Sequence, residues 1–195
     1  MTYARSSLLV LQVLAAVTLL SPAVQAQDSG STQFTITGTA PKVCALPAPV
    51  TTGTASNATF ASNTINITQF VDPNTALVTP SNLSLQFPNT LCNYNATVSL
   101  QSKSGGLVSN NASTVASGSG AFLQNVPYIV NASWGSFNLL LDTSTSKGST
   151  LTAANQTNGA TAGNLTLTIA TAASTLPVLQ GSYQDTLTLK IGAPM

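Results

Sequence analysis

Gly181 to Met195, with the sequence GSYQDTLTLKIGAPM, holds the clearest strand pattern of the chain. Leu187, Leu189 and Ile191 alternate there with threonine and lysine residues. This two-residue period predicts a β-strand with one face against a core and the other in water. Only four residues follow Ile191, so we expect this strand to be the last element. In an antiparallel protein such an end leaves a sheet edge or a groove that another strand can fill, which makes the three apolar residues candidates for an acceptor groove.

Short segments with the same alternation occur along the rest of the chain, and helical spacing is absent after the first 26 residues. The predicted strands cover residues 33–39, 43–46, 65–70, 82–87, 90–102, 126–134, 137–141 and 164–170, with a short edge-like piece at 176–179. The polar stretches at 51–62, 104–125 and 142–163 are expected to be loops, with a weak hairpin as the alternative for 104–120. This pattern predicts a single all-β domain over residues 27–195, a Greek-key sandwich of the immunoglobulin-like kind.

The composition favours an exported β-rich protein. Hydrophobic residues make up 43% of the chain and charged residues only 5%, compared with roughly 25% charged residues in an ordinary soluble domain. Low hydrophobicity combined with high net charge would indicate disorder, and this chain has neither. Since the formal net charge is +1, we expect no electrostatic attraction to nucleic acid or to an anionic membrane.

Residues 1–26 have the pattern of a signal peptide. Arg5 supplies a positive charge, an apolar run follows from Leu8 to Leu20, and Val24-Gln25-Ala26 is a small-x-small cleavage site. The alternative is a membrane anchor, but the run is shorter than the ~20 residues that a span needs. We therefore expect an exported chain that begins at Gln27 and has no membrane span in its mature form.

Cys44 and Cys92 are the only two cysteines. In an exported chain they are expected to form one disulfide, which closes a loop of 47 residues. A zinc site is the weaker alternative, because two thiols in a chain without histidine do not complete a zinc tetrahedron. The spacing also differs from the CxxC motif of redox-active pairs. No metal site is therefore predicted.

The chain offers few residues for catalysis. General acid–base chemistry usually needs histidine or paired carboxylates, and this chain has no histidine and only four acidic residues, which lie far apart in sequence. With so many serines, a Ser–Lys pair could arise by coincidence. The glycine-rich piece at 118–120 lacks the strand–loop–helix context of a phosphate loop. We expect neither an active site nor a cofactor.

Two further features have alternative interpretations. Trp134, Tyr128 and Tyr94 could line a sugar-binding face, but aromatic residues that alternate within strands are more often part of a core. Asp185 could bind a metal, although a role at a turn or at the start of the last strand is the more usual one for an aspartate in this position.

The segment from Leu179 to Leu189, LQGSYQDTLTL, resembles the G-x-Y-x-D-T-hydrophobic-T-hydrophobic ending of the spore coat protein U domain. That domain occurs in secreted bacterial proteins and in subunits of archaic chaperone–usher pili. Val43-Cys44-Ala45, Leu91-Cys92-Asn93 and the segment 126–130 are similar to the family's two cysteine positions and its internal tyrosine strand. The resemblance covers most of the mature chain.

The resemblance implies an immunoglobulin-like sandwich that lacks its final strand. In such pilins a periplasmic chaperone first fills the groove, and the N-terminal extension of the next subunit then replaces it by strand addition. The implied partners are this chaperone, an outer-membrane usher and neighbouring subunits, and the implied location is a fimbrium at the cell surface. Phe34 and Ile36 are the candidate donor side chains. Only 17 residues of the exported chain precede Cys44, so these two could instead belong to the subunit's own first strand.

Three functions are compatible with the sequence. The first is a structural subunit of a bacterial surface fibre, assembled by donor-strand exchange, with a role in adhesion or biofilm. The second is a self-complete secreted β-sandwich that binds a carbohydrate or matrix ligand through loops or Trp134. The third is a coat or matrix protein that uses the same fold without an usher. We expect the first, because candidate groove residues and candidate donor residues are both present.

Overall fold

The structure of the chain is a computed structural model that describes residues 31–110, 121–146 and 148–193. Contacts between residues divide the chain after Thr39, so segment 31–39 and the folded part from Ala40 onward are described separately. Segment 31–39 contains neither helix nor strand, and its side chains are exposed. The predicted strand at 33–39 is therefore wrong for the chain alone, since an alternating segment becomes a stable strand only when other strands pair with it.

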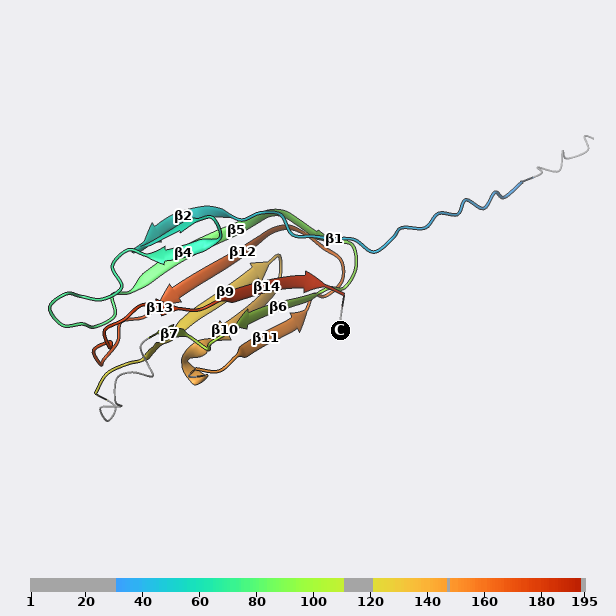
Figure 1. Cartoon of the computed structure of the whole chain (residues 1–195). Coiled ribbons are helices and arrows are strands. Elements are labelled where there is room, and N and C mark those ends of the chain that lie inside the picture. Colours follow the sequence, from blue (N-terminus) through green and yellow to red (C-terminus); the bar gives the residue numbers. More distant parts are fainter. Residues whose placement is uncertain (1–30, 111–120, 147, 194–195) are drawn as a thin grey trace, which may run out of the picture. The chain divides into compact units, whose positions relative to one another are not determined.

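The larger sheet is built around two long central strands, β5 (Ser81–Cys92) and β12 (Thr161–Thr171), as Figure 1 shows. Its strand order is β1 (Cys44–Ala45), β5, β12, β9 (Tyr128–Trp134) and β10 (Phe137–Asp142), and β2 (Val50–Ser56) also pairs with β5. All of these pairs are antiparallel.

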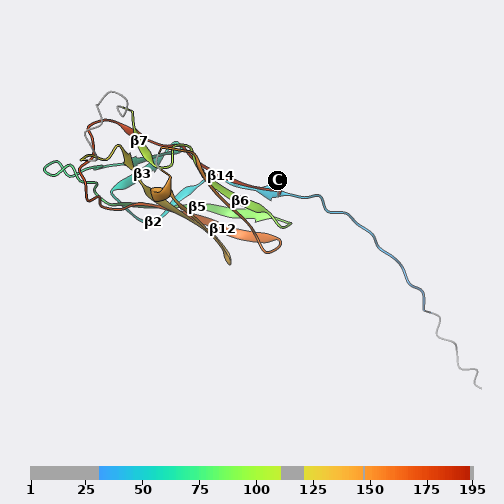
Figure 2. The same ribbon diagram turned by 90° about the horizontal axis from the view of Figure 1, so that it is seen from below.

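The second sheet has three antiparallel strands in the order β11 (Leu151–Gln156), β6 (Thr97–Ser102) and β14 (Leu187–Gly192). In Figure 2, β14 and β6 lie to one side of β5 and β12. The remaining strands form two small sheets. The first consists of β13 (Tyr183–Gln184), β7 (Leu107–Ser109) and β8 (Asn125–Val126). The second consists of β3 (Ala58–Ala61) and β4 (Thr64–Ile67). Thr143–Thr145 form a short 3-10 helix, η2.

The two main sheets share one hydrophobic core. Alternate side chains of β5, β9, β10 and β12 are buried in the same cluster as side chains of β6. Leu85 of β5, Leu100 of β6 and Trp134 of β9 are among its members. Because strands of both sheets contribute to one cluster, the sheets pack face to face. The predicted all-β, sandwich-like class is confirmed.

Some strands lie where the sequence predicts loops. The stretch 51–62 contains most of β2 and all of β3, and the stretch 142–163 contains β11. β2 has the sequence VTTGTAS and is exposed at six of its seven positions, so it has no apolar alternation that could reveal it. Polar strands of this kind are recognised by their partners in the sheet and not by their own pattern.

The predicted strand at 90–102 is two strands. β5 ends at Cys92 and β6 begins at Thr97, and residues 93–96 carry the chain from the larger sheet to the second one. The alternation continues across this break because both strands face the same core. Cys92, Ala96 and Val98 are all fully buried in it.

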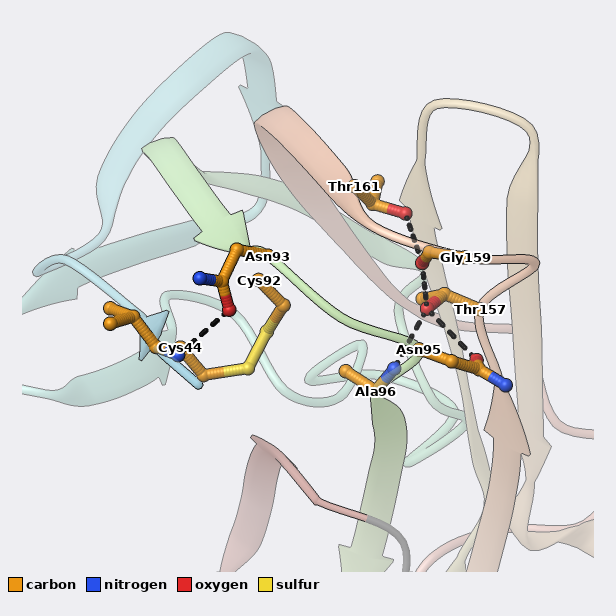
Figure 3. Close-up of a disulfide and its surroundings, with 9 residues drawn as sticks. Cys44, Cys92, Asn93, Asn95, Ala96, Thr157, Gly159 and Thr161 are labelled. Carbon is orange, nitrogen blue, oxygen red and sulfur yellow. Dashed lines mark hydrogen bonds between the residues drawn. A yellow bond between two sulfur atoms is a disulfide. The ribbon is translucent and has the colours of Figure 1, made fainter. Parts of the chain in front are cut away.

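The predicted Cys44–Cys92 disulfide is confirmed. The two residues are directly opposed in the β1–β5 pair, with their Cα atoms 4.2 Å apart (Figure 3). Asn93 adds a second connection at this place. Its side-chain oxygen accepts a hydrogen bond from the N–H of Val43 (2.8 Å), and its amide nitrogen donates to the carbonyl of Pro41 (2.8 Å). The start of the folded part is thus held onto the end of β5.

Candidate functional site

β14 forms an edge of the second sheet. Within the part of the chain that the structure describes, only β6 pairs with it, and no backbone hydrogen bond reaches its other edge. One bond at the start of the strand shows which residues of β14 are hydrogen-bonded to β6. In this bond the N–H of Lys103 donates to the carbonyl of Thr186. Bonded and non-bonded pairs alternate along an antiparallel ladder. Every second residue of β14, counted from Thr186, therefore bonds to β6.

The residues of β14 that do not bond to β6 are the three predicted groove residues. Leu187, Leu189 and Ile191 direct their backbone N–H and C=O groups away from β6, toward the unpaired edge. The pairing of β6 with β11, its other neighbour, is consistent with this assignment. The N–H of Thr157 donates to the carbonyl of Ala96, and these two residues are opposed when the register of the β11–β6 pair is continued by one residue. The bonds from β6 to β11 and to β14 then fall on alternate residues, as they must in a continuous sheet.

The side chains of these three residues lie on the core face of β14. Each opposes a fully buried residue of β6, and each packs against the main core cluster. They are nevertheless only partly buried. An additional strand paired with this edge would cover them, so Leu187, Leu189 and Ile191 share both an uncovered face and an unpaired edge.

Asp185 is the centre of a hydrogen-bond network just before β14. Its carboxylate accepts hydrogen bonds from the hydroxyl groups of Tyr128 (2.6 Å) and Ser102. It also accepts bonds from the backbone N–H groups of Ser104 (2.9 Å) and Thr186 (2.7 Å). Tyr128 belongs to the larger sheet and Ser102 to the second sheet. The carboxylate therefore connects the two sheets at the point where β14 begins.

This network changes the pKa values of both ionisable partners. Burial raises the pKa of the Asp185 carboxyl, but the hydrogen bonds from Ser102, Tyr128 and the two backbone groups outweigh it and hold the pKa below its usual range. Burial, together with the bond to Asp185, raises the pKa of the Tyr128 hydroxyl well above its usual value. The pair is thus a carboxylate and a protonated phenol throughout the neutral pH range.

Tyr183 anchors the segment that leads to Asp185. Its hydroxyl lies 2.7 Å from the carbonyl oxygen of Leu179 and 3.0 Å from that of Leu123. Its ring packs against Phe70, with 5.0 Å between the ring centroids. The tyrosine and the aspartate of the G-x-Y-x-D-T segment therefore both act as structural anchors for the last strand.

Phe34 and Ile36, the predicted donor residues, are 86% and 95% exposed. They lie in segment 31–39, which forms no strand. The first strands of the folded part are β1 and β2, which begin at Cys44 and Val50. No strand of the described residues therefore lies before Cys44.

The aromatic residues do not form a sugar-stacking face. Trp134 and Tyr128 are 1% and 5% exposed, so their interpretation as core residues is confirmed. Tyr94 is partly exposed, and the Nζ atom of Lys42 lies 5.4 Å from the centroid of its ring. Sequence analysis missed the roles of Ser102 and Tyr128 at Asp185, because neither residue lies in a pattern that marks a polar site.

No protein-family model, curated protein or solved structure matches this chain. In the described residues, no helix is both long and apolar enough to cross a membrane. The same residues contain no group of three or more cysteine, aspartate or glutamate side chains that could hold a metal ion. The functional interpretation therefore depends on the geometry of β14 and on the sequence of the chain.

Replacing Asp185 by asparagine is expected to lower the free energy of unfolding by about 2–3 kcal/mol at neutral pH, because hydrogen bonds to a charged acceptor are lost. The wild-type carboxyl has a lower pKa in the folded chain than its unfolded value of about 3.9. Its contribution is complete above the unfolded pKa and disappears as the pH falls through the folded pKa. Denaturant unfolding between neutral and strongly acidic pH should therefore show a smaller acid-induced loss of stability for D185N than for the wild type.

Asp142→Asn is the matched control for this experiment. The N–H of Ser144 lowers the pKa of the Asp142 carboxyl too, but Asp142 lies at the start of η2 and outside the network. We expect D142N to be much less destabilised. Equal destabilisation of the two variants, or an acid-induced loss in D185N as large as in the wild type, would contradict the role of Asp185.

Proposed function

We propose that the chain is a structural, non-catalytic subunit of a bacterial surface fibre that is assembled by donor-strand exchange. The observation that carries the proposal is the edge of β14, where core-facing residues are partly exposed and outward-directed backbone groups have no partner among the described residues. An extended segment of a second copy meets both needs, because its backbone pairs with the edge and its alternate side chains cover the core.

The strand order supports an immunoglobulin-like sandwich that lacks its last strand. In such sandwiches one sheet has the order A-B-E-D and the other C-F-G. Strands A to F correspond, in chain order, to β2, β5, β6, β9, β12 and β14. The neighbours A-B-E-D are then β2-β5-β12-β9 in the larger sheet, and the neighbours C-F are β6-β14 in the second sheet. Strand G would pair with β14 on its free edge. A donor strand from another subunit is proposed to take this place.

Segment 31–39 is suited to be the donor. Phe34 and Ile36 are two residues apart, so in an extended strand they project from the same face. Both are almost fully exposed in the single chain. Burying two such side chains in the groove of a neighbour would contribute about 3–6 kcal/mol to the contact. Backbone hydrogen bonds to the edge of β14 would add to this.

The proposed contact produces a fibre. The donor segment and the acceptor edge are different surfaces of the subunit. Each subunit therefore donates its segment to the next subunit and accepts the segment of the previous one. A head-to-tail contact of this kind generates an open filament when its rotation does not close. We expect a periplasmic chaperone to occupy the edge before assembly and an outer-membrane usher to export the growing fibre, which serves adhesion or biofilm formation.

Deleting residues 27–37 is expected to abolish assembly, because it removes both donor side chains. The mature chain, with and without these residues, is produced in a bacterial periplasm and run on non-reducing denaturing gels. The unheated full-length chain should give a ladder of multimers that disappears on heating. The truncated chain should give no ladder at any loading.

Two double variants separate side-chain chemistry from the mere presence of the segment. F34D/I36D places charges on the face that enters the groove, and T35D/T37D places the same charges on the opposite face. We expect the first variant to lose the ladder and the second to keep it. A ladder that survives in F34D/I36D, or a stable folded monomer from the full-length chain, would overturn the proposal.

A further inference from the structure

A polar cavity of about 330 Å³ lies at one end of the sandwich, beside β11, which pairs with β6 on the side opposite to β14. It is formed where the turn between β9 and β10 meets the end of β11 and the loop that leads into β12. Small-molecule sites in proteins commonly have volumes of about 300–1,000 Å³. The lining residues are Trp134, Ser136, Phe137, Asn138, Asn155, Gln156, Asn158 and Thr161.

The lining is rich in amide groups and carries no charge. Asn138, Asn155, Gln156 and Asn158 each present a carboxamide, which has two donors and one acceptor oxygen. The side chains of Asn138 and Asn158 are exposed and have no hydrogen-bond partner among the described residues. Ser136 adds an exposed hydroxyl beside them. Both donors and acceptors are therefore available to a ligand.

Trp134 contributes an independent observation. It is 1% exposed and forms part of the cavity wall. Its Nε1–H is the one buried side-chain nitrogen or oxygen group, in the described part of the chain, that lacks a hydrogen-bond partner. A buried donor without an acceptor is costly and is rare in folded proteins. A ligand would contact the part of the cavity wall that Trp134 forms, while the indole N–H itself is buried away from solvent.

The loop that carries Asn158 is held in place by its neighbour Thr157, which is 1% exposed (Figure 3). The hydroxyl of Thr157 accepts a hydrogen bond from the N–H of Ala96 (3.0 Å) and donates to the carbonyl of Gly159 (2.9 Å). Its backbone N–H donates to the carbonyl of Ala96 (2.8 Å). The backbone of the loop is thus attached to the start of β6, so the loop itself is held in place before a ligand binds.

We propose that this cavity binds a neutral saccharide unit through its carboxamide and hydroxyl groups. Sugar hydroxyls both donate and accept hydrogen bonds, as carboxamides do. Because its lining has no charged side chain, the cavity offers an ionic ligand no ion pair, and a neutral ligand loses less hydration on entering it. The site does not depend on strand exchange, because none of its residues lies on β14 or in segment 31–39.

Intrinsic fluorescence tests the site directly, since Trp134 is the only tryptophan of the chain. The purified mature chain is titrated with glucose, mannose, galactose and N-acetylglucosamine, and with glucosamine and glucuronic acid as charged analogues. At least one neutral sugar should give a saturable change with a Kd on the order of 1 mM. Glucosamine and glucuronic acid should bind less tightly than glucose and N-acetylglucosamine, whose ring configuration they share.

The double variant N138A/N158A is expected to weaken binding by about tenfold or more, because it removes two free carboxamides. Asn131→Ala is the matched control, because Asn131 is an exposed asparagine on β9 outside the cavity. Proton–nitrogen correlation NMR spectra of the wild type give a second readout. Adding the sugar should shift the resonances of the side-chain amides of the cavity and of the indole N–H.

Three results would overturn the proposal. The first is the absence of a saturable change with every neutral sugar. The second is equal binding by N138A/N158A and N131A. The third is a set of NMR shifts confined to residues outside the cavity. Each of these can occur in a chain that still forms fibres, so the saccharide site and the proposed assembly are tested separately.

Discussion

Replacing Cys44 and Cys92 together by serine is expected to lower the free energy of unfolding by about 4 kcal/mol. The disulfide closes a loop of 47 residues, and the chain-entropy model assigns about this much stabilisation to a closure of that length. Domains are typically stable by about 5–15 kcal/mol. A loss of about 4 kcal/mol would leave about 1–11 kcal/mol, so we expect the variant to fold but to be much less resistant to denaturant and to proteolysis than the wild type.

The position of the disulfide adds a local effect. β1 has only two residues and pairs only with β5 among the described strands, so two residue pairs and the contacts of Asn93 would hold it without the covalent bond. The measurement is denaturant unfolding followed by Trp134 fluorescence. Wild-type protein unfolded in the presence of a reductant is the matched control and should reproduce the variant. A change below about 1 kcal/mol would contradict the expected role of the closure.

The all-β class was predictable because the central strands have one buried and one exposed face. In β9, and in β5 from Ser81 to Phe87, buried residues recur at every second position, and the apolar residues of the sequence follow the same period. β2 and β11 were not predictable for the opposite reason. Their residues are mostly exposed on both faces, so their membership in a sheet depends on neighbours that lie far away in sequence.

The candidate site was predictable only in part. The alternation of Leu187, Leu189 and Ile191 identified the face of the last strand. A sheet edge or a groove was expected here from the position of the strand, but the strand that pairs with β14 and the register of the pair could not be inferred. The network of Asp185 was hidden as well, because its partners Ser102 and Tyr128 are 83 and 57 residues away along the chain.

Leu189→Pro is expected to abolish assembly while leaving the chain folded. The N–H of Leu189 points away from β6, so proline removes no hydrogen bond within the subunit. It does remove a donor that an incoming strand needs, and its ring obstructs the edge. Leu189→Ala is the first control, because it loses the same side chain and keeps the N–H. Both variants should unfold at similar denaturant concentrations, whereas only L189A should retain a ladder on unheated gels.

Lys190→Pro is the second control, because it tests the hydrogen-bond phase on which the whole interpretation of the edge depends. The N–H of Lys190 donates toward β6 in the pair with Ser99, so proline there breaks a bond inside the subunit. We expect K190P to be less stable than L189P by about 1–2 kcal/mol or more, although Lys190 has the more exposed side chain. Equal stability of the two proline variants would contradict the assigned phase. A ladder in L189P as strong as in L189A would show that the incoming strand does not pair with β14, and donor-strand exchange at this edge would have to be abandoned.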